Sequence, residues 1–237
     1  MRATLKSTTD LATFACDTLV IPFYEDLKLS SDSRAIDKAS QKQLAKILAS
    51  DDFNGHSGEI VTLRGIAGTA ANRIVLWGLG DKDKLNRQVM VKACDSLAKA
   101  VTALPGKHCA VLGNFKTNKA VPTSWAIQQI AARIARTTYL YTTTKPSKKN
   151  PVTLARVSIV NADSTAANRQ AVTQGVAIGQ GINIARELGN LPGNICTPKY
   201  LSGQARKLAK QHAAIKTTIL GEKQMQALSM DSLLSVG

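Results

Sequence analysis

Near the end of the 237-residue chain stands the stretch IARELGNLPGNICTPKYL, residues 184–201, which divides the sequence into two parts. A helical pattern runs into it, and Gly189-Asn190, residues that favour a left-handed helix end, predict where that helix stops. A proline-punctuated turn then leads to Thr197-Pro198, the N-cap and first-position residues typical of a new helix. The stretch therefore indicates a hinge between two structural units.

Composition places the chain among soluble globular proteins, with 44% hydrophobic and 20% charged residues. At this length it can hold one large domain, or one domain plus a piece of another. No apolar run is long enough to span a membrane, and Asp10 and Asp17 interrupt the one apolar patch near the N-terminus. We therefore expect no signal peptide, no membrane span and a cytoplasmic location.

The cysteines and histidines are too scattered to form a recognisable metal motif. The cysteines form no Cys-x-x-Cys pair, which favours buried, reduced thiols, and the histidines form no His-Glu-x-x-His motif. These residues are Cys16, Cys94, Cys109, Cys196, His56, His108 and His212. We expect no metal site made only of residues in this chain.

The net charge of +15, from 31 basic and 16 acidic residues, is the one unusual feature of the composition. Such an excess attracts nucleic acid or other polyanions, and it also keeps proteins soluble. Short basic runs such as residues 145–149 lack interleaved aromatic side chains, which favours a solvated surface. A basic module that binds nucleic acid or a nucleotide remains the alternative, with nucleic-acid affinity that is weak and independent of sequence.

Hydrophobic periodicity predicts alternating strands and helices over the first 189 residues. The expected strands are 1–7, 17–23, 59–63, 73–80, 109–112 and 152–160, and the expected helices are 33–49, one beginning near Asp83, 122–136 and 163–189. This order predicts an α/β fold in which helices flank a mixed sheet. Gly175 and Gly179 weaken the last helix but allow another backbone to approach it closely.

The predicted domains are an N-terminal α/β domain at residues 1–162, an interdomain helix at 163–189 and an incomplete second α/β domain at 190–237. The last part is expected to contain a helix at 198–212, a strand at 215–220 and a short helix at 222–228. With so few elements, this part is not expected to fold alone.

One strand-to-helix turn carries a candidate ligand site. Gly78-x-Gly80 follows a buried strand and precedes a helix, an arrangement whose amides can bind phosphate. However, Asp83 stands where the dinucleotide-binding motif needs its third glycine. Glycine also serves tight turns for conformational reasons alone, so a structural turn is the default interpretation.

Residues 184–201 closely resemble the passage by which bacterial leucyl (cytosol) aminopeptidases leave their N-terminal domain and enter their catalytic domain. In that family a helix ends in Ala-Arg-Asp/Glu-Leu-x-Asn, and a Pro-Pro-Asn turn and Thr-Pro-x-Tyr-Leu follow. Gly193 stands where the family usually has its second proline. Arg73–Leu85 resembles the family's Arg-x-x-Leu-x-Gly-Leu-Gly stretch, and Ile219–Gly237 resembles its Gly-Glu-x-x-Met…Leu-x-Val-Gly stretch. The resemblance implies an N-terminal domain, an interdomain helix and the start of a catalytic domain.

The resemblance also implies a chemistry: members of the family remove N-terminal residues from peptides, using two divalent metal ions, commonly zinc or manganese, and they form hexamers. Their ligands lie in Val-Gly-Lys-Gly-x-Thr-Phe-Asp-x-Gly-Gly and Asn-Thr-Asp-Ala-Glu-Gly-Arg, and neither motif occurs here.

An independent count of acidic residues agrees with this. After residue 150 the acids are Asp163, Glu187, Glu222 and Asp231, for which we expect local roles as an N-cap, a helix-face charge, a first-turn charge and a turn residue. We therefore assign no catalytic, cofactor-binding or metal-binding residue within this chain, and predict that the chain is inactive alone.

Overall fold

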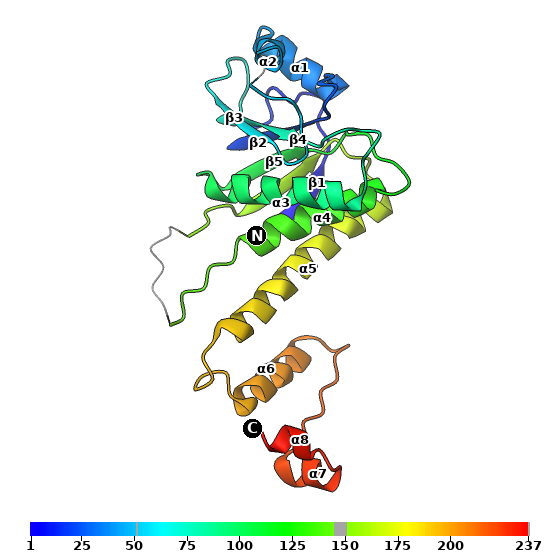
Figure 1. Cartoon of the computed structure of the whole chain (residues 1–237). Coiled ribbons are helices and arrows are strands. Elements are labelled where there is room, and N and C mark those ends of the chain that lie inside the picture. The colour runs from blue at the N-terminus through cyan, green and yellow to red at the C-terminus, as the bar shows by residue number, and fades with distance from the viewer. Residues whose placement is uncertain (51, 145–150, 237) are drawn as a thin grey trace. The chain divides into compact units, whose positions relative to one another are not determined.

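The computed structural model describes residues 1–50, 52–144 and 151–236. The strands are β1 (Arg2–Lys6), β2 (Thr18–Phe23), β3 (Ile60–Arg64), β4 (Arg73–Gly78), β5 (His108–Leu112) and β6 (Arg156–Val160) (Figure 1). The helices are α1 (Ser31–Ala39), α2 (Gln43–Leu48), α3 (Arg87–Ala103), α4 (Thr123–Thr137), α5 (Ala166–Asn190), α6 (Pro198–Gln211), α7 (Glu222–Ala227) and α8 (Asp231–Leu234).

Contacts divide the chain into two compact units. The first holds Met1–Leu140 and the described residues that follow residue 150 as far as Ile184. The second holds Tyr141–Thr144 and the described residues from Ala185 onward. The division falls inside α5, so this one helix belongs in part to each unit.

The first unit is built on a six-stranded sheet of order β1-β6-β5-β2-β4-β3. All neighbouring pairs are parallel except β3 with β4, so the sheet is mixed, as the sequence predicted. The β2 strand continues through Pro22, because β5 pairs with β2 only as far as Val20 and needs no amide from the proline.

Successive residues of each central strand face opposite sides of the sheet, where they belong to two separate hydrophobic clusters. Leu19 and Ile21 pack with Ile36 of α1 and Leu44 of α2 on one face. Val20 packs on the other face, with side chains of α3, α4 and α5. Figure 1 shows α1 and α2 on one side of the sheet and α3 and α4 on the other. The result is the helix–sheet–helix sandwich that alternating strands and helices predict.

Two glycines bring α4 and α5 into close contact. A Cβ atom at Gly175 would lie 2.5 Å from the carbonyl oxygen of Gln128, and one at Gly179 would lie 2.6 Å from that of Ala132. Asn183 Nδ2 also donates to the carbonyl of Ala135 at 3.0 Å. The prediction that these glycines admit a neighbouring backbone is confirmed.

The predicted helix over residues 33–49 is wrong, because it is two helices. Gln41 and Lys42 have φ angles of 53° and 63°, a left-handed conformation that cannot continue a right-handed helix. The Asp37 carboxylate then accepts from the Ala45 amide at 2.8 Å and fixes the corner between α1 and α2.

Several other predicted boundaries move. The α3 helix starts at Arg87 rather than near Asp83, since Asn86 is its cap, and β6 starts at Arg156 rather than at residue 152. Gly189 and Asn190 are helical, so the predicted left-handed end of α5 is wrong. The short basic run at residues 145–149 lies outside the described residues.

The second unit is helical in its described residues. Thr197 caps α6, its Oγ1 accepting from the Tyr200 amide at 3.2 Å, as predicted. The strand predicted at 215–220 does not form, because among the described residues of this unit no strand stands beside it to pair with. Asp231 begins the short helix α8, where a turn was expected.

Candidate functional site

The carboxyl ends of three parallel strands meet at one edge of the sheet. Because β2 lies between β4 and β5, the segments that follow Phe23, Gly78 and Leu112 are neighbours in space. Ligands of α/β proteins usually bind at this edge. The Gly78-x-Gly80 turn lies here, so its phosphate-binding capacity depends on which of its donors are free.

The two glycines of that turn are required by local packing. A Cβ at Gly78 would lie 2.1 Å from the carbonyl oxygen of His56, and Gly80 has a φ of +85°. The amide of Gly78 donates to Glu59, and that of Gly80 donates to Gly55, both to backbone oxygens. These turn amides are therefore engaged in holding the 55–59 loop.

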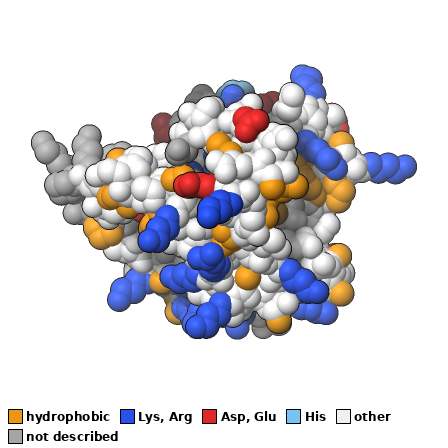
Figure 2. Space-filling model, turned by 90° about the horizontal axis from the view of Figure 1, so that it is seen from below, with side chains coloured by type: hydrophobic (Ala, Val, Ile, Leu, Met, Phe, Trp, Pro, Cys, Tyr) orange, Lys and Arg blue, Asp and Glu red, His pale blue; other side chains and the backbone are white. Residues whose placement is uncertain are grey.

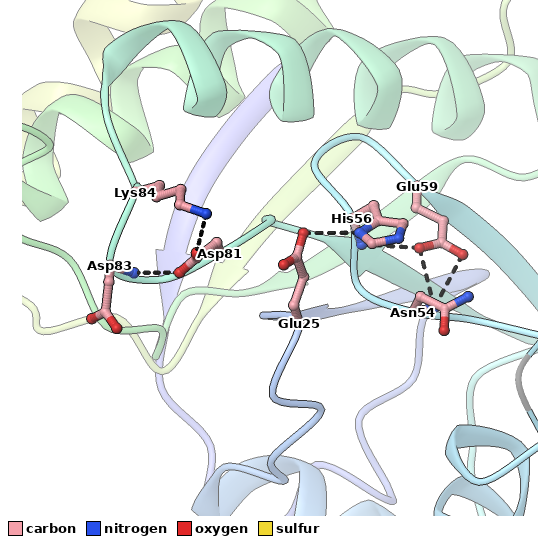
Figure 3. Close-up of polar contacts among 7 residues, drawn as sticks. All are labelled: Glu25, Asn54, His56, Glu59, Asp81, Asp83 and Lys84. Carbon is pink, nitrogen blue, oxygen red and sulfur yellow. Dashed lines mark hydrogen bonds and ion pairs between the residues drawn. The ribbon is translucent and has the colours of Figure 1, made fainter.

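The donors at the start of α3 are also engaged within the chain. Asn86 Oδ1 accepts from the amides of Gln88 and Val89 at 2.9 and 3.0 Å, capping the helix. Asp81 accepts from the Asp83 amide at 2.9 Å and pairs with the Lys84 ammonium at 3.1 Å (Figure 3). The structure thus gives the glycine turn a conformational role.

An exposed polar network fixes the neighbouring loop. His56 Nδ1 lies 2.8 Å from Glu25 Oε1, and the Glu59 carboxylate accepts from the Asn54 and His56 amides (Figure 3). The hydrogen bond to Glu25 raises the pKa of His56. The network ties the loop before β3 to the segment after β2.

The four acids after residue 150 take separate local roles. The Asp163 carbonyl accepts from Asn168 Nδ2, while Thr165 Oγ1 accepts from the Asn168 amide, so Thr165 and not Asp163 caps α5. Glu187 Oε1 accepts from Thr143 Oγ1 at 2.6 Å. Glu222 and Asp231 lie in the first turns of α7 and α8.

Within the described residues, no three His, Cys, Asp or Glu side chains gather into a group that could hold a metal ion. Cys16, Cys94 and Cys109 are buried, as predicted, while Cys196 is half-buried, and all four are free thiols. His108 is buried, and its Nε2 atom lies 2.9 Å from Ser158 Oγ. Burial lowers the pKa of His108, and the nearby positive charge of Arg156 lowers it further. The donors present do not fit a two-metal centre.

On the face that Figure 2 shows, basic side chains occur at several places, interspersed with hydrophobic and uncharged side chains. Sequence reasoning nevertheless missed one group of four. Lys28, Arg34, Lys82 and Lys116 line a single cleft at the carboxyl edge of the sheet. Their only shared signal in the sequence is position, since each lies in a segment that follows a parallel strand. None of the helices that the structure describes is long and apolar enough to cross a membrane.

Comparison with known proteins identifies the family. The profile of the Cytosol aminopeptidase family, N-terminal domain, matches residues 20–148, and that of the same family's catalytic domain matches residues 183–237. The chain is 35% identical over 222 residues to a probable cytosol aminopeptidase of Nitrosococcus oceani, covering 92% of this chain and 44% of that protein. It is 37% identical over 227 residues to a probable cytosol aminopeptidase of Xanthomonas oryzae, covering 95% of this chain and 45% of that protein.

Solved structures show the same fold. A mutant of tomato leucine aminopeptidase matches with a TM-score of 0.79 and 22% identity, over 97% of this chain and 46% of that one. The bottromycin maturation enzyme BotP matches with a TM-score of 0.67 and 20% identity, over 90% of this chain and 41% of that one. The chain thus spans less than half the length of these relatives. Two profile matches, which together cover most of the sequence, show that this chain belongs to the cytosol aminopeptidase family.

Proposed function

We propose that this chain is the N-terminal portion of a metal-dependent leucyl aminopeptidase, a cytoplasmic enzyme that removes N-terminal residues from peptides. Its relatives are named cytosol aminopeptidases, and it spans 44–45% of the length of two of them. On this proposal the first unit shapes and shields the catalytic domain and helps to assemble the enzyme into a hexamer. The 237 residues alone do not catalyse the reaction.

The observation that carries the proposal is the exposure of apolar side chains in the second unit. Its helices α6, α7 and α8 bury no residue. Large apolar side chains stand exposed there instead: Leu201, Leu208, Ile215, Leu220, Leu228 and Leu233. Exposed apolar side chains in such number characterise a surface that another part of a protein covers. The remainder of the family's catalytic domain supplies such a cover.

The metal ions belong, on this proposal, to the part of the catalytic domain that this chain does not span. The described acids, histidines and cysteines do not converge, so they do not fit two metal ions. BotP has been solved in complex with Mn, which supports manganese as the metal of the whole enzyme; zinc is the other metal that we propose. When bound, such ions activate water and polarise a carbonyl group.

The experiment compares two proteins. One is the 237-residue chain, and the other is the same chain joined at its end to the remaining sequence of the Xanthomonas oryzae relative. Each is assayed for hydrolysis of leucine anilide with zinc or manganese, and for metal stoichiometry by equilibrium dialysis. We expect chelator-sensitive activity and two bound metal ions only in the extended protein. Two tightly bound ions, or turnover, in the 237-residue chain would contradict the proposal.

We further propose the domain limits 1–162, 163–189 and 190–237, with the long helix as the connection. The change of contact unit within α5, after Ile184, supports a connecting role for this helix. Trypsin should therefore cut first at exposed basic residues of α6, such as Lys199 and Arg206, and leave the sheet-bearing unit intact. Earlier cleavage within residues 1–112 would count against these limits.

A further inference from the structure

The sheet-bearing unit contains a cleft lined mainly by polar and basic side chains. Its volume is about 450 Å³, within the range of small-molecule sites. Three parts of the sequence line it: residues from Pro22, at the end of β2, to Arg34 in α1; Lys82 after β4; and Asn114–Lys116 after β5. Because these strands are adjacent and parallel, the cleft lies at the carboxyl edge of the sheet, where α/β proteins bind ligands.

The charge of this cleft is strongly positive. Lys28, Arg34, Lys82 and Lys116 line it, and Asp26 is its one acidic residue among the described lining. Asp26 pairs with Lys28 at 3.6 Å. The other three basic side chains form no ion pair with the described residues, so their charges are available to an anion.

The start of α1 adds to this potential. Ser30 caps the helix, and Ser30 and Ser31 both line the cleft. Ser30 Oγ accepts from the Ser33 amide at 3.2 Å, and the Ser30 carbonyl accepts from the Arg34 amide. Asp32, the acid of this first turn, accepts instead from Asn161 Nδ2 at 3.2 Å. The positive end of the helix dipole thus lies at the cleft, and the Asp32 carboxylate in the same turn offsets part of it.

Two half-buried aromatic side chains complete the lining. The Tyr24 hydroxyl donates to the Lys116 carbonyl, which ties the segment after β2 to the segment after β5. Phe115 packs edge-on against Trp77, with ring centroids 6.2 Å apart, so its position is fixed by the core. Burial raises the pKa of Tyr24 to about 12, so its hydroxyl adds no negative charge at neutral pH. The cleft thus offers cations and flat apolar surface together.

We propose that this cleft binds a small phosphate-bearing ligand of the nucleotide class. Arg34, Lys82 and Lys116 hold the phosphate groups, and the organic part lies against Tyr24 and Phe115. Arginine pairs with phosphate oxygens through two parallel hydrogen bonds, and lysine acts as a point charge. This site is distinct from the Gly78-x-Gly80 turn: Lys82 follows that turn, and residues 78–80 do not line the cleft.

The test is isothermal titration of the 237-residue chain with ADP, pyrophosphate and adenosine. We expect ADP to bind more tightly than pyrophosphate, and adenosine to bind least. A triple variant, Arg34→Gln, Lys82→Gln and Lys116→Gln, should bind ADP about 30-fold more weakly, since each exposed charge contributes roughly threefold. Its circular dichroism and melting temperature are recorded to show that it folds.

A matched control removes the same charge elsewhere. The variant Lys38→Gln, Lys46→Gln and Lys99→Gln changes three exposed lysines that do not line the cleft. It should alter ADP affinity less than about threefold, since charges at a distance are screened by salt. Equal weakening by both triple variants, wild-type affinity in the cleft variant, or no ADP binding at millimolar concentration would each overturn the proposal. Adenosine or pyrophosphate binding as tightly as ADP would also overturn it.

Discussion

Replacing Gly175 with alanine should reduce the free energy of unfolding of the sheet-bearing unit, although alanine is the better helix former. Within a helix, alanine is favoured over glycine by about 1 kcal/mol. At this position, however, the new Cβ would lie 2.5 Å from the Gln128 carbonyl oxygen and 2.8 Å from the Ala131 Cβ. The helices α4 and α5 must then move apart, and overpacking of this kind costs about 1–3 kcal/mol. We expect a net loss of about 1 kcal/mol.

Gly181→Ala is the matched control, in the same helix and with the same change of side chain. A Cβ at Gly181 meets no atom within 4 Å. Only the helix propensity changes there, so this variant should gain about 0.5–1 kcal/mol. The difference between the two variants isolates the cost of separating the helices.

Urea denaturation followed by far-ultraviolet circular dichroism measures both free energies. Tryptophan fluorescence, from Trp125 on α4 and Trp77 on β4, provides a second probe of unfolding. In thermal melts, each 1 kcal/mol corresponds to about 2–4 °C for a unit of this size. Equal stabilisation by Gly175→Ala and Gly181→Ala would refute the reasoning, since it would mean that α4 and α5 do not touch at Gly175.

Three further predictions concern single interactions. Asp95→Asn should lower the free energy of unfolding by about 1–2 kcal/mol, because Asp95 Oδ1 lies 2.6 Å from the Nη1 atom of Arg133, whose side chain is only 16% exposed. Urea denaturation measures this loss, and an unchanged midpoint would contradict it. Glu25→Gln should lower the pKa of His56, which proton NMR measures. Because the hydrogen bond to Glu25 raises this pKa in the folded protein, the stabilisation of the fold by the His56–Glu25 pair is present at low pH and is lost as pH rises through the folded pKa. Identical His56 titrations in the variant and the original protein would count against this. Iodoacetamide at neutral pH should modify Cys196 first, because burial raises the pKa of the other three thiols. Mass spectrometry measures the rates, and equally fast modification of the three buried cysteines would contradict this prediction.

Local sequence patterns predicted most elements of the first unit, because strands such as β4 are continuous apolar runs and helices such as α4 have a clear apolar face. They failed where structure depends on distant residues. Gln41 and Lys42 take left-handed conformations that nothing in their type requires. The strand expected at 215–220 has the right residues, but no partner strand stands beside it among the described residues.

The cleft was not predicted for a related reason. Lys28, Lys82 and Lys116 are neighbours only because the strand order places β2 between β4 and β5. Periodicity along the chain predicts that strands exist, but it does not give the order in which they pair. Charge counting likewise gave a total of +15 with no indication that part of it converges on one edge. The same limit explains why the Gly78-x-Gly80 turn, a local motif, drew attention instead.

The pairing of β1 has a consequence for how the protein is made. At the edge of the sheet that the structure describes, β1 pairs with β6, and Arg2 lies beside Arg156, roughly 150 residues later in the chain. At a synthesis rate of about 5–20 residues per second, β1 leaves the ribosome about 8–30 seconds before its partner does. Its outward Arg2, Thr4 and Lys6 side chains keep that waiting strand polar, which disfavours pairing with strands of other nascent chains. The sheet is therefore completed only after nearly the whole first unit has been translated.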